Sequence, residues 1–151
     1  MVSGYFSFKP GGSHRPPAQN AEEWLKKRDS QKAVEIDDYV QTASELARNR
    51  IVAYHPLIAS GFVKIFKYEE MFFDKEAFLI SVLEHFGLKA SPTVVSDVAA
   101  KHDKRPKKED PTKHIRKGVP GDHKEKLSPD TIAWLNGYFR EAVAPLGYSL
   151  T

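Results

Sequence analysis

The chain has 151 residues, of which 40% are hydrophobic and 28% charged, with a net charge of +3, a balance typical of one folded domain with a modest core. The absence of cysteine excludes disulfides, thiolate metal sites and cysteine nucleophiles. The first residues lack a signal-peptide pattern and no apolar run approaches the roughly 20 residues that span a membrane, so we expect a cytoplasmic protein without membrane contact.

Helical patterns dominate the first part of the chain. A stretch rich in glycine and proline over residues 9–17 excludes regular structure. Asn20 then predicts the N-cap of a short helix over Ala21–Asp29. Apolar residues at steps of three and four predict a longer helix over Ile36–Arg50, and Pro56 is expected to end or kink any continuation.

The alternation of apolar and basic residues over Phe62–Lys67 predicts a strand. Asp74 and Gly87 mark the start and the end of the following helix, and another short helix is predicted over Thr93–His102. A single strand cannot form a stable sheet. The fold is therefore either a helical domain with one odd strand or part of an α/β fold whose other strands lie outside the sequence.

A basic segment separates these helices from the last one. Between Lys101 and Lys126, ten Lys or Arg stand against five Asp or Glu, which gives this segment +5 and leaves −2 for the remainder. Its prolines and glycines predict an irregular loop over 101–127. The charge indicates an anionic partner, such as a phosphate ligand, nucleic acid or a sulfated molecule, although a solvated loop without a partner has the same composition.

The last helix is predicted to begin at Ser128, with Pro129 in its first turn, and to end at Pro145 and Gly147.

Three segments resemble, in the same order, segments of sulfotransferases that use 3′-phosphoadenosine 5′-phosphosulfate (PAPS). Val2–Phe8 resembles the end of the family's 3′-phosphate motif, with its Val-Ser pair and aromatic residues. Phe66–Met71 resembles the strand that ends in Tyr-Glu-Asp-Leu or Tyr-Glu-Asp-Met before a helix closing in Phe-Gly-Leu. Ile115–Lys124 resembles the signature Arg-Lys-Gly-x-x-Gly-Asp-Trp-Lys. Residues 1–151 are thus similar to the C-terminal, 3′-phosphate-binding part of a single sulfotransferase domain.

The resemblance implies a site for PAPS or for its product 3′,5′-adenosine bisphosphate (PAP). Arg116, Lys117, Gly118 and Ser3 would bind the 3′-phosphate, and Tyr68 would contact the adenine. These residue types suit a phosphate, because arginine offers a planar fork, lysine a compact charge, and glycine an accessible backbone N–H. No catalytic residue and no metal ligand is assigned.

The sequence also departs from the family pattern. His123 occupies the place of a tryptophan, Asp122 is expected to be structural, and the family's dimer motif is not recognisable. No Lys-Ser-Gly-Thr-Thr-like P-loop is present, and the catalytic base would belong to the same absent part. We therefore expect a partial P-loop-type α/β fold, predominantly helical with few strands and without the N-terminal P-loop strand and helix.

As a member of that family the protein would transfer a sulfuryl group from PAPS to an acceptor hydroxyl or amine, but this chain is expected to be inactive alone. The acceptor is not identified. The alternative is a non-catalytic module that binds phosphonucleotides or polyanions, without specific recognition of nucleic acid. Pairing with a separate chain that carries the P-loop remains open, as does self-association through uncovered faces of the helices near 78–86 and 132–143.

Overall fold

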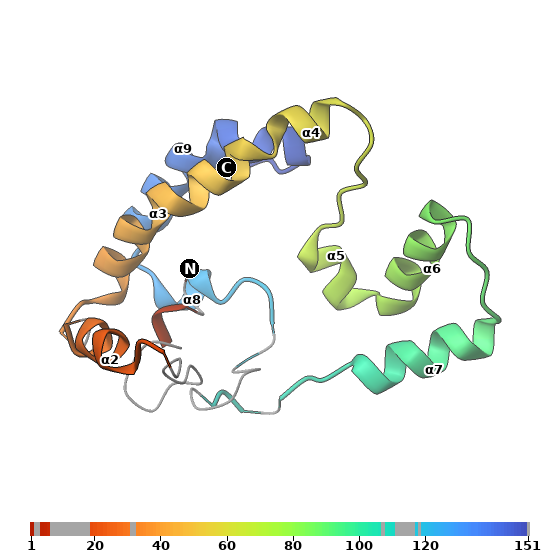
Figure 1. Ribbon diagram of the computed structural model, residues 1–151, viewed down its shortest axis with the longest axis horizontal. Helices are drawn as coiled ribbons and strands as arrows, with labels where there is room; N and C mark the ends of the chain where they lie inside the picture. The colour runs from red at the N-terminus through yellow and green to blue at the C-terminus, as the bar shows by residue number, and fades with distance from the viewer. Residues whose placement is uncertain are drawn as a thin grey trace.

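The computed structural model describes residues 1, 4–6, 19–30, 33–106, 108–110, 117 and 119–150, and of Lys27 the backbone alone. Within these residues the protein is helical and forms no strand. Figure 1 shows the helices in chain order, with a short 3₁₀-helix η1 (Ala144–Leu146) after the last of them: α2 (Ala21–Ser30), α3 (Ile36–Ala53), α4 (His55–Ala59), α5 (Tyr68–Phe73), α6 (Lys75–His85), α7 (Pro92–His102), α8 (His123–Lys126) and α9 (Pro129–Val143).

The predicted helix boundaries are confirmed where the sequence carries local signals. Asp74 caps α6, because its Oδ1 accepts a hydrogen bond from the Ala77 N–H at 2.9 Å. Ser128 caps α9 in the same way, accepting from the Thr131 N–H at 3.2 Å. After α6 the chain leaves the helix through Gly87, whose φ of +65° is a conformation that glycine adopts without steric cost.

The interruption predicted at Pro56 is also present. Helix α3 runs to Ala53, three residues beyond the expected Arg50, and Tyr54 separates it from α4. Pro56 lies in the first turn of α4, where no backbone N–H is needed for a helical hydrogen bond.

The strand predicted over Phe62–Lys67 is wrong. This segment is an irregular connection between α4 and α5, and the described residues contain no strand with which it could pair. Of the expected partial α/β fold, the predominantly helical character is confirmed, whereas the described residues form no strand. The sequence analysis also missed α5 and the short helix α8, which lies inside the basic segment predicted to be irregular over 101–127.

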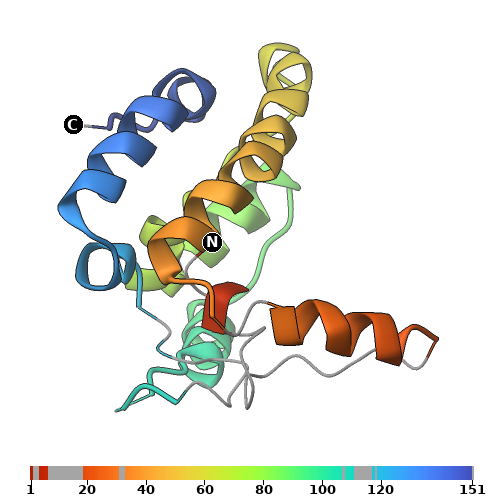
Figure 2. The ribbon, with the colours of Figure 1, turned by 90° about the vertical axis from the view of Figure 1, so that its left-hand side faces the viewer.

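Helices α3 and α9 pack side by side (Figures 1 and 2) and form the centre of the larger of two groups of packed helices. Val40 and Leu127 form the buried centre of this group, and Phe6 packs on them from the start of the chain. The Asp37 carboxylate joins the N-terminal ends of the two helices, since its Oδ1 accepts from the Ser128 N–H at 3.1 Å. Helix α2 extends away from this pair in Figure 2.

Helices α5, α6 and α7 form a second packed group, in which Phe72, Val95 and Ala99 are buried. The C-terminal residues connect the two groups. The Tyr148 hydroxyl donates a hydrogen bond to Glu69 Oε2 at 2.8 Å, and the Lys67 ammonium lies 5.2 Å from the centre of the Tyr148 ring. Burial, together with the Glu69 hydrogen bond, raises the pKa of Tyr148 to about 12, so its hydroxyl stays protonated and keeps donating.

Candidate functional site

Lys117 is a predicted phosphate ligand that the structure describes. It lies before α8 in the chain, and its ammonium forms ion pairs with Asp122 Oδ1 at 3.2 Å and with the Glu125 carboxylate. The hydrogen bond to Glu125, supported by that to Asp122 and opposed by desolvation, raises the pKa of Lys117. The side chain is 23% exposed, so a protonated lysine is held by two carboxylates within reach of solvent. Asp122 binds this ammonium, and its expected role of fixing the Gly121–Asp122 turn stays a prediction.

Ser3, Arg116 and Gly118 lie outside the described residues. The structure does describe Phe6, close to Ser3 in the sequence, and its position relative to α8. The Phe6 ring lies 5.6 Å from the Lys126 ammonium and packs against the buried pair Val40 and Leu127. The start of the chain thus packs beside α8, the helix that Lys117 precedes in the chain.

The charges around His123 come from three parts of the chain. Burial lowers the pKa of His123 below its ordinary value of 6.5, and the Lys124 ammonium lowers it further. The carboxylates of Asp122 and Glu69 raise it, and the Met1 amino group lowers it with the smallest effect. The charges that shift this pKa therefore belong to the start of the chain, to α5 and to the third segment of the resemblance.

Tyr68, the predicted adenine contact, is the first residue of α5 and is 49% exposed. Its ring is tilted against Phe72, with 6.0 Å between the ring centres. It lines a groove of about 350 Å³ between α5, α6 and α7. Its neighbour Glu69 is the residue bonded to Tyr148 and within electrostatic reach of His123. The half-exposed Tyr68 ring could therefore contact an adenine close to the other segments that resemble sulfotransferases.

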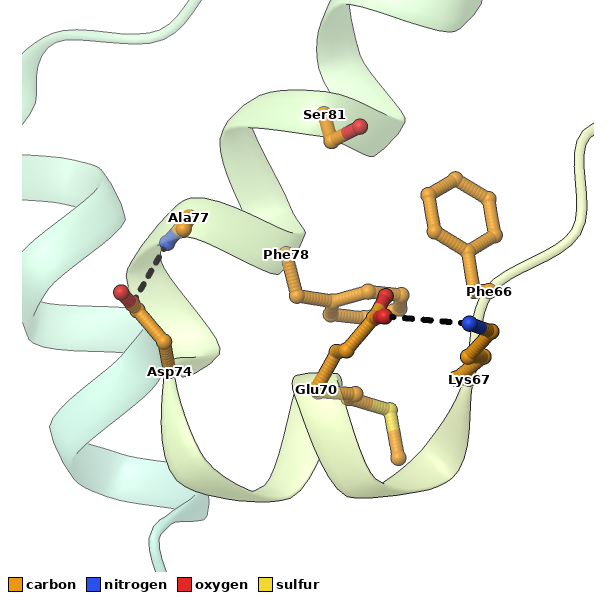
Figure 3. Close-up of a pocket in the computed structure, with 8 residues that line it drawn as sticks. Phe66, Lys67, Glu70, Asp74, Ala77, Phe78 and Ser81 are labelled. Atoms are coloured by element: carbon orange, nitrogen blue, oxygen red, sulfur yellow. Dashed lines mark hydrogen bonds and ion pairs between the residues drawn. The ribbon is translucent and has the colours of Figure 1, made fainter. Parts of the chain in front are cut away.

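A second cavity, of about 200 Å³, lies between α5, α6 and the segment before them (Figure 3). Phe66 and Phe78 meet edge to face across it, with 5.1 Å between ring centres. Lys67 and Glu70 form an ion pair at 3.7 Å on its wall, and the Asp74 carboxylate that caps α6 lies on the same wall. This cavity is thus partly acidic.

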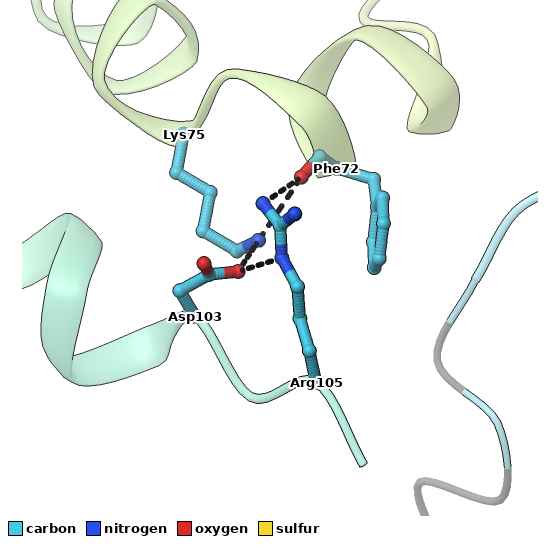
Figure 4. A network of polar contacts seen from close by, with 4 residues as sticks. All are labelled: Phe72, Lys75, Asp103 and Arg105. Carbon is cyan, nitrogen blue, oxygen red and sulfur yellow. Dashed lines mark hydrogen bonds and ion pairs between the residues drawn. The ribbon is translucent and has the colours of Figure 1, made fainter. Parts of the chain in front are cut away.

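A polar cluster that no sequence motif indicated joins the end of α7 to α5 and α6 (Figure 4). Asp103 Oδ1 accepts from Lys75 Nζ at 2.6 Å and from Arg105 Nε at 2.8 Å. The same two cations donate to the Phe72 carbonyl at the end of α5, at 3.2 and 3.4 Å. Hydrogen bonds from Lys75 and then Arg105 lower the pKa of Asp103. Nothing local in the sequence pairs residues so far apart, so this cluster could not be predicted.

Within the described residues, no group of three or more His, Asp or Glu side chains could hold a metal ion. Every helix in that part of the chain is too short or too polar to cross a bilayer. Compared with protein-family models, with curated proteins and with solved structures, the chain matches none.

Proposed function

We propose that the chain binds a 3′-phosphorylated adenine nucleotide, PAPS or PAP, through Arg116, Lys117 and Gly118. The observation that supports this most directly is the contact between Phe6 and Lys126. It brings the segment next to Ser3 against the helix that follows Lys117. One phosphate could then be contacted from both segments, which is the arrangement that the resemblance to sulfotransferases requires.

Lys117 could reach a phosphate only in exchange for an anionic partner that it already holds. Lys117 is protonated, partly exposed and already bound to anionic oxygens, namely those of Asp122 and Glu125. A phosphate dianion would replace the Glu125 carboxylate as the partner of this ammonium, because an ion with a higher charge attracts it more strongly. Tyr68 would offer its exposed ring to the adenine.

The reaction class proposed from the resemblance is sulfuryl transfer from PAPS to an acceptor hydroxyl or amine. Such a reaction also requires a cradle for the 5′-phosphosulfate and a base for the acceptor proton. The sequence contains no P-loop-like segment to serve as the cradle. We therefore propose that this chain supplies binding, with no transfer by itself, and an assay with labelled PAPS that gave sustained turnover would contradict this division.

The binding proposal is tested by calorimetric titration with PAP. Arg116→Ala and Lys117→Ala are each expected to weaken binding roughly tenfold or more, since hydrogen bonds to charged groups contribute about 1.5–3 kcal/mol. Lys101→Ala, which removes an exposed charge on α7, is the matched control and should leave the affinity unchanged. Equal losses in all three variants would contradict a specific site.

The second candidate is a non-catalytic polyanion-binding module, and the basic segment between Lys101 and Lys126 favours it. Heparin and single-stranded DNA would then bind as tightly as PAP. Their affinity would fall steeply with added salt, and each lysine or arginine removed would weaken it by a similar amount. Binding of PAP that is retained in salt, with no comparable binding of heparin, would exclude this candidate.

A further inference from the structure

The groove between α5, α6 and α7 has almost purely apolar walls. Its volume of about 350 Å³ is lined on these walls by Met71, Phe72, Phe78, Leu79, Val98 and Ala99. This volume lies at the lower end of the range of small-molecule sites, which are typically about 300–1,000 Å³. The groove could therefore enclose a bicyclic aromatic body or a medium-length acyl group, and removing that body from water would drive its binding.

The polar side chains that line the groove are cationic or neutral. They belong to Tyr68, Lys75, His102 and Lys104, and no Asp or Glu is among the described lining residues. Lys104 is exposed and forms no ion pair within the part of the chain that the structure describes. Its ammonium is therefore free to meet an anion at the edge of the groove.

The nearest carboxylate does not cancel this positive charge. Asp103 is already shared by two cations, Lys75 and Arg105, as Figure 4 shows. With two cations and one carboxylate, these three side chains carry a net charge of +1. Together with Lys104, it makes the end of the groove near the C-terminus of α7 electropositive.

The neighbouring cavity of Figure 3 gives an internal comparison. It shares the side chains of Met71 and Phe78 with the groove, but Glu70 and Asp74 lie on its wall and it is smaller, at about 200 Å³. Lys67 also lines this cavity and pairs with Glu70, so its three charged side chains carry a net charge of −1. The same apolar side chains therefore face a weakly acidic cavity on one side and a basic groove on the other.

From these observations we infer that the groove between α5, α6 and α7 binds a small amphiphilic anion, an aromatic or acyl body that carries one sulfonate or carboxylate. The apolar body would lie against Phe72, Leu79 and Val98, with its anionic group at Lys104. Tyr68 lines this groove and is also the proposed adenine contact, so the two sites would be neighbours, but the phosphate ligands of the nucleotide site lie in another segment.

Two fluorescent probes with nearly the same apolar body test the inference. 8-Anilinonaphthalene-1-sulfonate carries a sulfonate, whereas N-phenyl-1-naphthylamine does not. We expect the sulfonate to bind about threefold more tightly, a preference of the size that a partly exposed ion pair gives. Lys104→Gln should remove this preference, and Lys101→Gln, at the end of α7 but outside the groove, should retain it. Equal affinities of the two probes for the unmodified protein would overturn the inference.

A second pair of variants separates the groove from the other exposed apolar side chains. Val98→Glu places a carboxylate in the wall and should weaken both probes about fivefold or more. Ile80→Glu makes the same change at an exposed position of α6 that does not line the groove, and should have no effect. Similar losses in both variants, with circular dichroism unchanged, would indicate nonspecific adsorption and reject the site.

Nucleotide competition distinguishes this inference from the proposed function. Arg116→Ala should leave probe binding unchanged even though it weakens PAP. Saturating PAP should likewise leave the sulfonate probe bound. Displacement of the probe by PAP would assign the groove, with Tyr68 at its wall, to the nucleotide and would contradict a separate site.

Discussion

Among single residues, Lys117 has the surroundings most relevant to ligand binding. Asp122 and Glu125 together hold its ammonium, so one positive charge faces two negative charges. At the proposed site an incoming phosphate would compete with these carboxylates, and its affinity would depend on how strongly they hold the lysine. Substitutions of Asp122 or Glu125 should therefore change the affinity for phosphate, although neither side chain would contact the phosphate.

Glu125→Gln should therefore strengthen PAP binding, by roughly threefold to tenfold, because it removes the anion that the phosphate must displace. Calorimetric titration measures the change. Glu76→Gln, an exposed change on α6, is the control for the altered net charge. An unchanged or weaker affinity in Glu125→Gln would show that Lys117 does not exchange its partner.

His123 should make stability depend on pH. Its pKa in the folded protein is below the ordinary value of 6.5, so the unfolded chain binds the proton more readily. This contribution to the free energy of unfolding is complete above pH 6.5 and is lost as the pH falls through 6.5 toward the folded-state pKa. Urea midpoints at about pH 8 and about pH 5 should therefore differ less in His123→Gln than in the unmodified protein. A pKa of His123 above 6.5 by NMR titration would contradict this account.

At the scale of elements, the ends of α3 and α9 are coupled through one carboxylate. Asp37 Oδ1 accepts from both the N–H and the hydroxyl of Ser128, at 3.1 and 3.3 Å, while the Ser128 hydroxyl oxygen accepts from the Thr131 N–H. A helix cap and a tertiary contact thus share the same atoms. The α3–α9 packing should consequently depend on this pair as well as on the buried Val40 and Leu127.

Asp37→Ala and Ser128→Ala should each lower the free energy of unfolding by about 1–2 kcal/mol. The double variant should cost less than the two single losses added together, because both remove the same hydrogen bonds. Urea unfolding provides these values. Asp38→Ala, which removes an exposed acid from the same first turn of α3, should cost less than either, and full additivity of the two losses would argue against the shared contact.

The elements also show what the sequence could predict. The starts of α6 and α9 were predicted because Asp74 and Ser128 cap them through hydrogen bonds to residues three positions ahead, and such local signals can be read from the sequence. Helix α7 was predicted over Thr93–His102, but its cap Ser91 was missed. Phe62–Lys67 was wrong because strand formation depends on a partner that alternation alone does not supply. In the candidate site, Lys117 was predicted from its motif, but its partnership with Glu125 depends on the fold of α8.

At the scale of the whole molecule, the described residues leave many large apolar side chains uncovered. Large apolar side chains are exposed on several elements, with Phe62 at 87%, Phe86 at 67% and Phe73 at 65%. Exposed apolar surface of this extent favours association with another copy or with a partner.

Sedimentation velocity should therefore show a concentration-dependent increase in mass. If the protein stays monomeric, urea should unfold it with a free energy at or below the lower end of the usual range, about 5 kcal/mol. A compact monomer of 17.1 kDa with ordinary stability would contradict this expectation.

The measurement that tests the central claim most directly compares two nucleotides that differ by one phosphate. PAP carries the 3′-phosphate that Arg116, Lys117 and Gly118 are proposed to bind, and 5′-AMP lacks it while keeping the adenine and the 5′-phosphate. Calorimetry on the unmodified chain should show PAP binding at least about tenfold more tightly. Equal affinities for the two nucleotides, or no binding of either, would contradict the proposed 3′-phosphate site.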